Sequence, residues 1–123
     1  MTFKALKVKN KKLLVWGDGS QGRAFLHVKD VVSAVSKSIL YEGSCTNFMI
    51  GPNECTSIKY IAELIISNPL TCAEEIVYDE SMPIGDIGRF SNSKLAKNEL
   101  NWEVSVNLEE GISDLVANIA KEL

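Results

Sequence analysis

Apolar residues recur at helical spacing in three segments of the chain, and each segment begins at a residue that can cap a helix. The predicted N-caps are Asp30, Ser57 and Asn107, because a side-chain oxygen at this position accepts a hydrogen bond from a free backbone N–H group. We expect Gly43 to end the first helix and Asn68-Pro69 to end the second. Residues 107–110 spell Asn-x-x-Glu, a variant of the capping box, at the start of the last helix.

Shorter patterns predict two further helices and several strands. The helices are expected over residues 2–10 and 93–100. Runs of apolar, β-branched and aromatic residues predict strands at 13–16, 23–28, 47–50 and 76–78. The alternation of strands and helices from Phe25 to Tyr78 predicts parallel pairing, whereas Val15 and Phe25 are close enough in sequence to pair antiparallel. The expected fold class is therefore α/β, with a small sheet of mixed direction flanked by helices.

A glycine-rich loop follows the first predicted strand and spells Gly-Asp-Gly-Ser-Gln-Gly over residues 17–22. The pattern G-x-G-x-x-G after a strand is typical of dinucleotide binding, in which the third glycine opens a helix that receives a pyrophosphate. Here Gly22 is followed by Arg-Ala-Phe-Leu-His-Val, and the best N-cap comes only at Asp30. A small cofactor half-site ending near Glu54 and a plain hairpin turn without a ligand are the two alternatives that this loop leaves open.

Composition and charge limit the classes of partner. The 123 residues are 46% hydrophobic and 24% charged, which suits one globular domain over residues 1–123. The net charge of −3 disfavours nucleic acid as a partner, since such binding depends on neutralising phosphates. Five lysines fall within the first twelve residues, and we interpret that cluster as a solvated face.

Three cysteines, Cys45, Cys55 and Cys72, lack the spacing of metal ligands. With no secretory leader in front of them, they indicate reduced thiols in a cytoplasmic protein. No apolar run reaches the length that spans a membrane. We therefore expect no metal site, no membrane partner and a cytoplasmic location.

Several motifs occur in a fixed order along the chain. Residues 15–30 read V-W-G-D-G-S-Q-G-R-A-F-L-H-V-K-D, residues 47–51 read N-F-M-I-G, and Ser93-Lys94 is followed by Leu100-Asn101-Trp102. This order resembles the C-terminal, substrate-binding part of the NAD(P)-dependent sugar epimerase/dehydratase family, the extended short-chain dehydrogenase/reductases. That family reads close to v-x-G-d-G-x-x-x-R-x-F-x-x-V-x-D, then y-N-i-G, then S-K-a and L-G-W. The resemblance covers nearly the whole chain and is strongest to the members that act on GDP-sugars.

The resemblance assigns roles to three residues. It implies that Arg23 and Arg89 hold the diphosphate of a nucleoside-diphosphate sugar and that Trp16 lies beside the nucleotide. The loop over residues 79–90, which delivers Arg89, leaves two alternatives open: closure over this ligand, or a plain connection whose arginine faces solvent. Asn101 stands where the family has Gly, and we expect it to adopt the same left-handed conformation at the end of a helix.

The cofactor loop and the Tyr-x-x-x-Lys catalytic pair of that family have no counterpart in these residues. None of Tyr41, Tyr60 and Tyr78 has a lysine four residues later. His27 is the only histidine and lies among apolar neighbours, which indicates a structural imidazole rather than a base. We therefore expect no catalytic residue and no bound NAD(P) in the isolated chain, so that NAD(P) would require a separately encoded cofactor domain.

Two classes of function follow. In the first, the chain is an orphan or split substrate-binding domain that binds a nucleoside-diphosphate sugar but does not catalyse a reaction alone. In the second, it is a protein-interaction or oligomerisation module derived from such an enzyme, with no ligand. The resemblance also implies that residues 47–50 and the helix from Asp30 lie against the cofactor domain in such enzymes. Because so short a chain cannot bury all of Val31, Val35, Phe48 and Ile50, we expect an exposed apolar face. We therefore expect a homodimer, formed by helix packing or by pairing of an uncovered strand edge.

Overall fold

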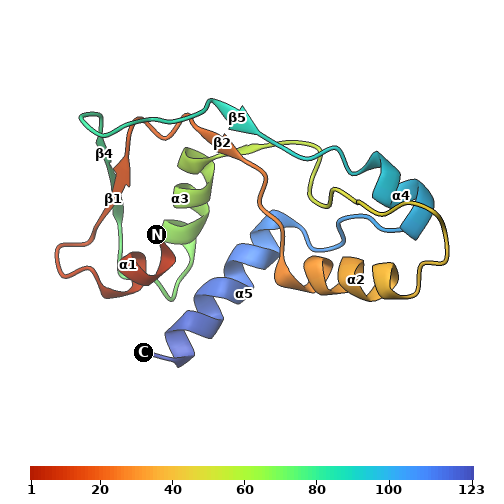
Figure 1. Cartoon of the computed structure of the whole chain (residues 1–123). Coiled ribbons are helices and arrows are strands. Elements are labelled where there is room, and N and C mark those ends of the chain that lie inside the picture. The colour runs from red at the N-terminus through yellow and green to blue at the C-terminus, as the bar shows by residue number, and fades with distance from the viewer.

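The chain forms five helices and five strands, and the computed structural model describes all of residues 1–123 (Figure 1). Strands and helices are interspersed along the sequence, which confirms the predicted α/β class. The elements are α1 (Thr2–Lys7), β1 (Lys12–Trp16), β2 (Gly22–Arg23), α2 (Val28–Ile39), β3 (Thr56–Ser57), α3 (Ile58–Ser67), β4 (Glu75–Asp79), β5 (Gly88–Arg89), α4 (Lys94–Leu100) and α5 (Leu108–Lys121).

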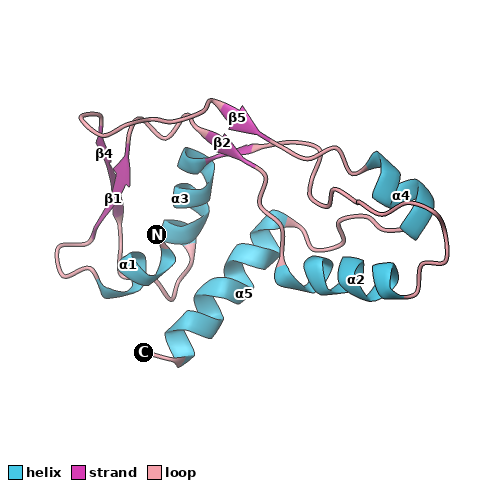
Figure 2. Cartoon of the chain, viewed as in Figure 1, coloured by secondary structure: helices cyan, strands magenta, loops and turns pink.

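The strands form two small sheets rather than one. In the first, β1 pairs in parallel with β4, from Lys12 opposite Glu75 to Trp16 opposite Asp79. In the second, β2 is the central strand, antiparallel to β3 and parallel to β5 (Figure 2). The mixed strand direction is confirmed. The alternative pairing of Val15 with Phe25 is wrong, because β4 pairs with β1 and β2 ends at Arg23.

Two hydrophobic clusters hold these elements together. Alternation along β1 turns Leu13 and Val15 inward, where they meet the buried faces of α3 and α5. The larger cluster consists of Ala5, Leu13, Val15, Ile61, Ala62, Ile65, Ala73, Ile112 and Val116. The smaller one joins α2 to α4 and consists of Ala34, Ala96, Leu100 and Trp102. In Figure 1, α2 and α4 accordingly lie together at the end of the molecule away from β1 and β4.

Four of the predicted helix ends are confirmed, and one of them is the end of α3 at Ser67, directly before Asn68-Pro69. The side chain of Ser57 accepts a hydrogen bond from the N–H of Tyr60 at 3.1 Å, and that of Asn107 accepts one from Glu110 at 2.8 Å. Asn101 ends α4 with φ 47° and ψ 46°, the left-handed conformation expected where the family has Gly.

Asp30 does not cap α2 as predicted. The helix begins at Val28, and its N-cap is His27, whose Nδ1 accepts a hydrogen bond from the N–H of Lys29 at 3.2 Å. Asp30 is buried, and its carboxylate accepts hydrogen bonds from the hydroxyl and N–H of Ser105 and from the N–H of Val106. Partners 75 and 76 positions away in sequence therefore take the oxygens that a cap would use.

Other predicted boundaries also shift. Residues 47–50 form no strand, because no other strand lies beside them, although Phe48 and Ile50 still pack against the smaller cluster. The strand predicted over 23–28 ends at Arg23, α1 ends at Lys7, and α2 ends at Ile39, before Gly43. None of the five helices is both long and apolar enough to cross a membrane.

Candidate functional site

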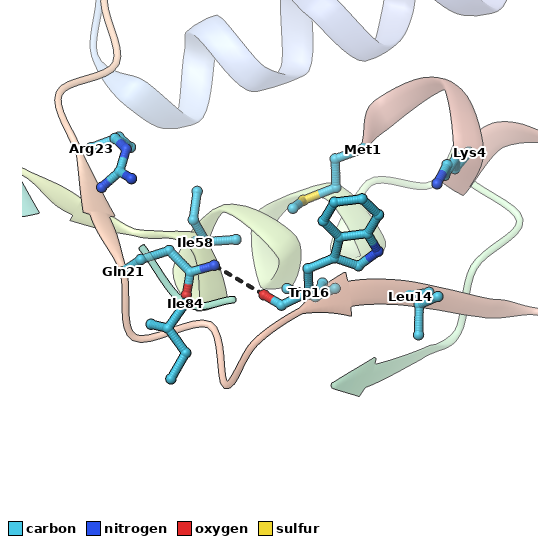
Figure 3. A pocket seen from close by; sticks show the side chains of 9 residues that line it. Met1, Lys4, Leu14, Trp16, Gln21, Arg23, Ile58 and Ile84 are labelled. Carbon is cyan, nitrogen blue, oxygen red and sulfur yellow. Dashed lines mark hydrogen bonds between the residues drawn. The ribbon is translucent and has the colours of Figure 1, made fainter. Parts of the chain in front are cut away.

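A hollow of about 340 Å³ opens beside the end of β1, where the glycine-rich loop begins (Figure 3). Its size lies in the range of small-molecule sites, and its lining is mainly apolar with a few polar groups, as such sites usually are. The lining residues are Met1, Lys4, Leu14, Val15, Trp16, Gln21, Arg23, Ile58 and Ile84. Two of the three residues that the resemblance singled out, Trp16 and Arg23, are therefore brought together in one hollow.

Trp16 reaches the hollow through the alternation of β1. Leu14 and Trp16 point away from the core face that holds Leu13 and Val15, and the Trp16 side chain remains 56% exposed. Its carbonyl accepts a hydrogen bond from Gln21 Nε2 at 3.0 Å, which ties the end of β1 to the far side of the glycine-rich loop (Figure 3). An exposed indole in a concave site offers a flat apolar surface on which a base can stack.

The glycine-rich loop is folded against the start of α3. Gly17 and Gly19 have φ of 74° and 78°, a left-handed conformation that a glycine adopts without strain. The carbonyl of Gly19 accepts the N–H of Lys59, and the carbonyl of Gln21 accepts the N–H of Ile58, both at 2.9 Å. The loop thus uses the free N–H groups of the first turn of α3 that would otherwise attract a phosphate.

The same region leads into a strand, not into a helix. Gly22 lies in β2, and the next helix begins only at Val28. A dinucleotide motif needs its third glycine at the N-terminus of a helix, so the residues of this loop do not fit a bound nicotinamide cofactor.

Arg23 is held in place by backbone carbonyls. Its side chain is partly buried, and its Nη1 donates to the carbonyl of Gly22 at 2.6 Å and to that of Asp86 at 2.9 Å. These bonds fix the guanidinium at the rim of the hollow while the other donors of its planar fork remain available.

Arg89 lies beside Arg23 but does not line the hollow. The two arginines are register partners in the parallel pair of β2 and β5, so their side chains leave the same face of the small sheet. The Arg89 side chain is 76% exposed and forms an ion pair with the Asp86 carboxylate. Both guanidinium groups therefore meet Asp86, one at its carbonyl and the other at its carboxylate.

The loop between β4 and β5 forms one wall of the site. The carbonyl of Ile87 accepts the N–H of Gly22 at 2.7 Å, which anchors the end of this loop to β2. Ile84 lies against Gly17, where an added Cβ would come within 3.1 Å of Ile84 Cγ1, and it lines the hollow. Of the loop for which closure over a ligand is one alternative, Ile84 is the part that borders the hollow.

Sequence reasoning missed the other lining residues. Gln21 carries the one buried side-chain polar atom without a partner, Oε1. Lys4 belongs to the N-terminal lysine cluster, for which the sequence predicts a solvated face, yet it borders the hollow next to Trp16 (Figure 3). One signal in the sequence indicated this site: Leu14 and Trp16 alternate with the buried residues of β1 and therefore share its exposed face.

A larger hollow of about 460 Å³ lies between the start of α2 and α5, with Phe25, His27 and Leu115 in its wall. It is lined by no lysine or arginine, and Glu54 is among its lining residues. An anionic diphosphate therefore finds no permanently charged cation there, so the smaller hollow suits such a ligand better.

His27, the three tyrosines and the three cysteines do not line the hollow beside β1. His27 uses Nδ1 as a helix cap, and its Nε2 lies 4.0 Å from the Asp114 carboxylate. The pKa of all three tyrosines is raised: that of Tyr41 by its hydrogen bond to Glu99, that of Tyr60 by its hydrogen bond to Glu109, and that of Tyr78 chiefly by burial. No group of three His, Cys, Asp or Glu side chains is placed to hold a metal ion, and the cysteines are free.

Comparison with known proteins gives a consistent picture. Residues 2–51 match the model of the "NAD dependent epimerase/dehydratase family". The chain is 31% identical over 101 residues to a probable GDP-L-fucose synthase of Oryza sativa subsp. japonica, covering 82% of this chain and 30% of that protein. It is 28% identical over 109 residues to a putative UDP-glucose 4-epimerase of Methanocaldococcus jannaschii, covering 89% and 34%. The chain thus spans about a third of the length of these curated relatives.

Solved structures agree with the sequence matches. A UDP-glucose 4-epimerase of Thermotoga maritima with UDP-glucose superposes with a TM-score of 0.80 at 27% identity, covering 98% of this chain and 38% of that one. A dTDP-glucose 4,6-dehydratase of Bacillus anthracis in complex with NAD superposes with a TM-score of 0.80 at 30% identity, covering 98% and 37%. Nearly every residue of this chain therefore has a counterpart in a larger fold of this kind.

Proposed function

Because the chain belongs to the NAD-dependent epimerase/dehydratase family, we propose that its 123 residues bind a nucleoside-diphosphate sugar and do not catalyse a reaction by themselves. One observation carries this proposal: Trp16 and Arg23 line the same hollow, and Arg89 lies next to Arg23 across β2 and β5. An aromatic surface beside two arginines matches the two chemically distinct parts of such a ligand, a flat base and a charged diphosphate.

In this proposal the base stacks on Trp16 and the diphosphate lies against the arginines. The guanidinium fork of Arg23 donates to phosphate oxygens from the rim of the hollow, and Arg89 adds charge from outside it. Asp86 competes with the ligand for Arg89, because its carboxylate already pairs with that side chain. Each charge-assisted hydrogen bond to phosphate is worth about 1.5–3 kcal/mol.

The relatives support this ligand class. The structure from Thermotoga maritima is described with UDP-glucose, and the similar plant protein is described as a GDP-L-fucose synthase. Both names point to nucleoside-diphosphate sugars with different bases. We extend that class to this chain on the strength of Trp16 and Arg23.

We further propose that these residues alone neither bind NAD(P) tightly nor turn over a sugar. The first N–H groups of α3 are occupied by the glycine-rich loop, and no Tyr-x-x-x-Lys pair is present. A nicotinamide cofactor would supply hydride chemistry in this family, and here it would have to be held by residues other than these 123. A calorimetric titration with NAD(H) and NADP(H) tests this, and low-micromolar affinity for either would contradict it.

Thermal-shift screening of GDP- and UDP-sugars at millimolar concentration tests the proposed ligand. We expect stabilisation by at least one of them, because a ligand that binds only the folded chain raises its melting temperature. Arg23→Ala should weaken binding at least about tenfold, and Arg23→Lys should restore part of the loss because it keeps the charge without the fork. Lys121→Ala, an exposed cation at the far end of α5, is the control and should leave binding unchanged. No stabilisation by any sugar would contradict the proposal.

A second candidate function rests on an uncovered face of α2. Val28, Val32, Val35 and Ile39 follow one another at helical spacing and are 65%, 58%, 51% and 76% exposed. The face is only partly the one predicted, since Val31, Phe48 and Ile50 are half-buried and only Val35 of that set is exposed. A stripe over the 12 residues of α2 is about 18 Å long.

We propose that this stripe packs against its counterpart in a second copy and forms a homodimer. A two-fold contact lets one apolar helix face cover itself in both copies. Light scattering coupled to size exclusion at tens of micromolar should give the dimer mass, and Val32→Glu should give the monomer mass. Ile87→Glu places the same charge at a residue that is 84% exposed outside the stripe, and it should leave the dimer intact. A monomer in the unmodified chain would contradict this proposal.

A further inference from the structure

The hollow carries a positive charge at each end. Figure 3 shows Arg23 at one end, Lys4 at the other and the indole of Trp16 between them, close to Lys4. A ligand that places its diphosphate at Arg23 and its base on Trp16 therefore extends the outer edge of that base toward Lys4.

Lys4 has no partner within the chain. The ammonium groups of Lys11, Lys12, Lys29 and Lys97 form ion pairs with carboxylates, whereas Lys4 forms neither an ion pair nor a hydrogen bond. All three of its N–H donors are thus available to a ligand.

The backbone below Lys4 is fixed by its neighbours. Ala5 is fully buried, and its carbonyl accepts the N–H groups of Cys72 at 2.9 Å and Ala73 at 3.1 Å. These bonds tie α1 to the segment that leads into β4. Lys7, on the same helix, lies 5.3 Å from the ring centre of Phe3 and does not line the hollow.

We propose that Lys4 reads the base of the ligand and selects bases whose outer edge carries a carbonyl oxygen. This inference rests on the proposed binding of a nucleoside-diphosphate sugar. Guanine offers O6 and N7 as acceptors, and uracil and thymine offer O4, so each can accept a hydrogen bond from the ammonium group. Adenine and cytosine present an amino group at the corresponding position, which donates and therefore opposes Lys4, and adenine keeps only N7 as an acceptor on that edge. The expected preference is for guanine and uracil (or thymine) nucleotides over adenine and cytosine nucleotides.

Calorimetric titration with four ligands that share one sugar tests this selection: UDP-glucose, GDP-glucose, ADP-glucose and CDP-glucose. We expect the unmodified chain to bind the first two about tenfold more tightly than the last two, the effect of one hydrogen bond to a charged, partly solvated group. Lys4→Met keeps the length and apolar stem of the side chain, and it should bring all four dissociation constants to within about twofold of one another. Lys4→Arg should retain the preference, and Lys7→Met is the matched control on the same helix.

The outcomes separate this inference from the function on which it rests. If none of the four sugars binds, the proposed function fails and this inference fails with it. If they bind but the unmodified chain does not discriminate, or Lys4→Met keeps the original ranking, the role of Lys4 is wrong while the proposed function stands. A circular dichroism spectrum and melting curve of each variant show whether it is folded, so that a loss of binding is not mistaken for a loss of structure.

Discussion

Replacing Asp30 with Asn should destabilise the fold by removing a hydrogen-bond acceptor from a buried position. Asp30 is 1% exposed, and its Oδ1 accepts the hydroxyl of Ser105 at 2.5 Å and the N–H of Ser105 at 3.2 Å, while its Oδ2 accepts the N–H of Val106 at 3.2 Å. An Asn side chain can keep Oδ1 in place, but its amide nitrogen faces the N–H of Val106 with a second donor. One buried N–H group is then left without an acceptor.

The size of the effect follows from these three bonds. A buried donor without a partner costs about 1–3 kcal/mol, and the bonds from Ser105 lose the extra strength that a charged acceptor gives them. We expect a total loss of about 2–4 kcal/mol, against about 5–15 kcal/mol for the stability of an ordinary domain. In urea this corresponds to a midpoint lower by roughly 1–2 M.

The loss should depend on pH in a defined direction. Burial acts to raise the pKa of Asp30, but the hydrogen bonds from Ser105 and Val106 outweigh it and hold the pKa below its ordinary value. A carboxylate with a lowered pKa in the folded state contributes its stability above the unfolded pKa, near 3.9, and loses it as the pH falls through the folded pKa. The difference between the unmodified chain and Asp30→Asn should therefore be largest at neutral pH and shrink below about pH 4.

Urea unfolding of both proteins at pH 7 and at pH 3 measures this difference. Asp18→Asn is the control, because Asp18 also has a lowered pKa, chiefly from the side-chain hydrogen bond of Ser20, but lies fully exposed in the glycine-rich loop. Its substitution should change the midpoint much less. Equal midpoints for Asp30→Asn and the unmodified chain at pH 7, or a difference that grows as the pH falls, would refute the reasoning.

Three further substitutions test the geometry around the site. Gly19 and Gly85 have φ of 78° and 74°, but a Cβ at Gly19 would lie 2.7 Å from the ring of Tyr78, while one at Gly85 would meet nothing closer than 3.4 Å. Gly19→Ala should therefore lower the melting temperature clearly more than Gly85→Ala, and equal losses would argue against this packing. Asp86→Asn removes the carboxylate that competes with the ligand for Arg89, so it should tighten binding of a nucleoside-diphosphate sugar. The gain should be no more than about fivefold, because exposed ion pairs are weak. Weaker binding of the sugar in calorimetry would contradict this competition.

The sequence predicts those features that depend on a few adjacent residues. Ser57, Asn107 and Asn101 take the predicted places at helix ends because capping uses neighbouring backbone groups. Asp30 departs from its prediction because Ser105 and Val106, distant in sequence, supply better partners for its carboxylate. Residues 47–50 have the composition of a strand, but a strand needs a neighbour, and the fold places none there.

The candidate site likewise contains residues whose positions follow from a local motif and residues whose positions depend on tertiary contacts. Trp16 and Arg23 flank one loop, so their motif predicts that they lie near each other. The position of Arg89 depends on the register of two strands of two residues each, which no local pattern specifies. Lys4 and Ile84 reach the hollow through the docking of α1 and of the loop before β5, and both depend on tertiary contacts.

The most direct test of ligand binding uses the two tryptophan side chains as reporters in one nitrogen-15 NMR spectrum. The indole of Trp16 is exposed in the hollow, whereas that of Trp102 is buried in the smaller cluster and donates from Nε1 to the carbonyl of Asp30 at 3.0 Å. Titration with UDP-glucose or GDP-glucose should shift the Trp16 indole signal and the amide signals of Arg23 and Arg89, while the Trp102 indole signal stays in place. A Trp16 signal that does not move at millimolar ligand, or equal shifts of both indoles, would contradict binding in this hollow.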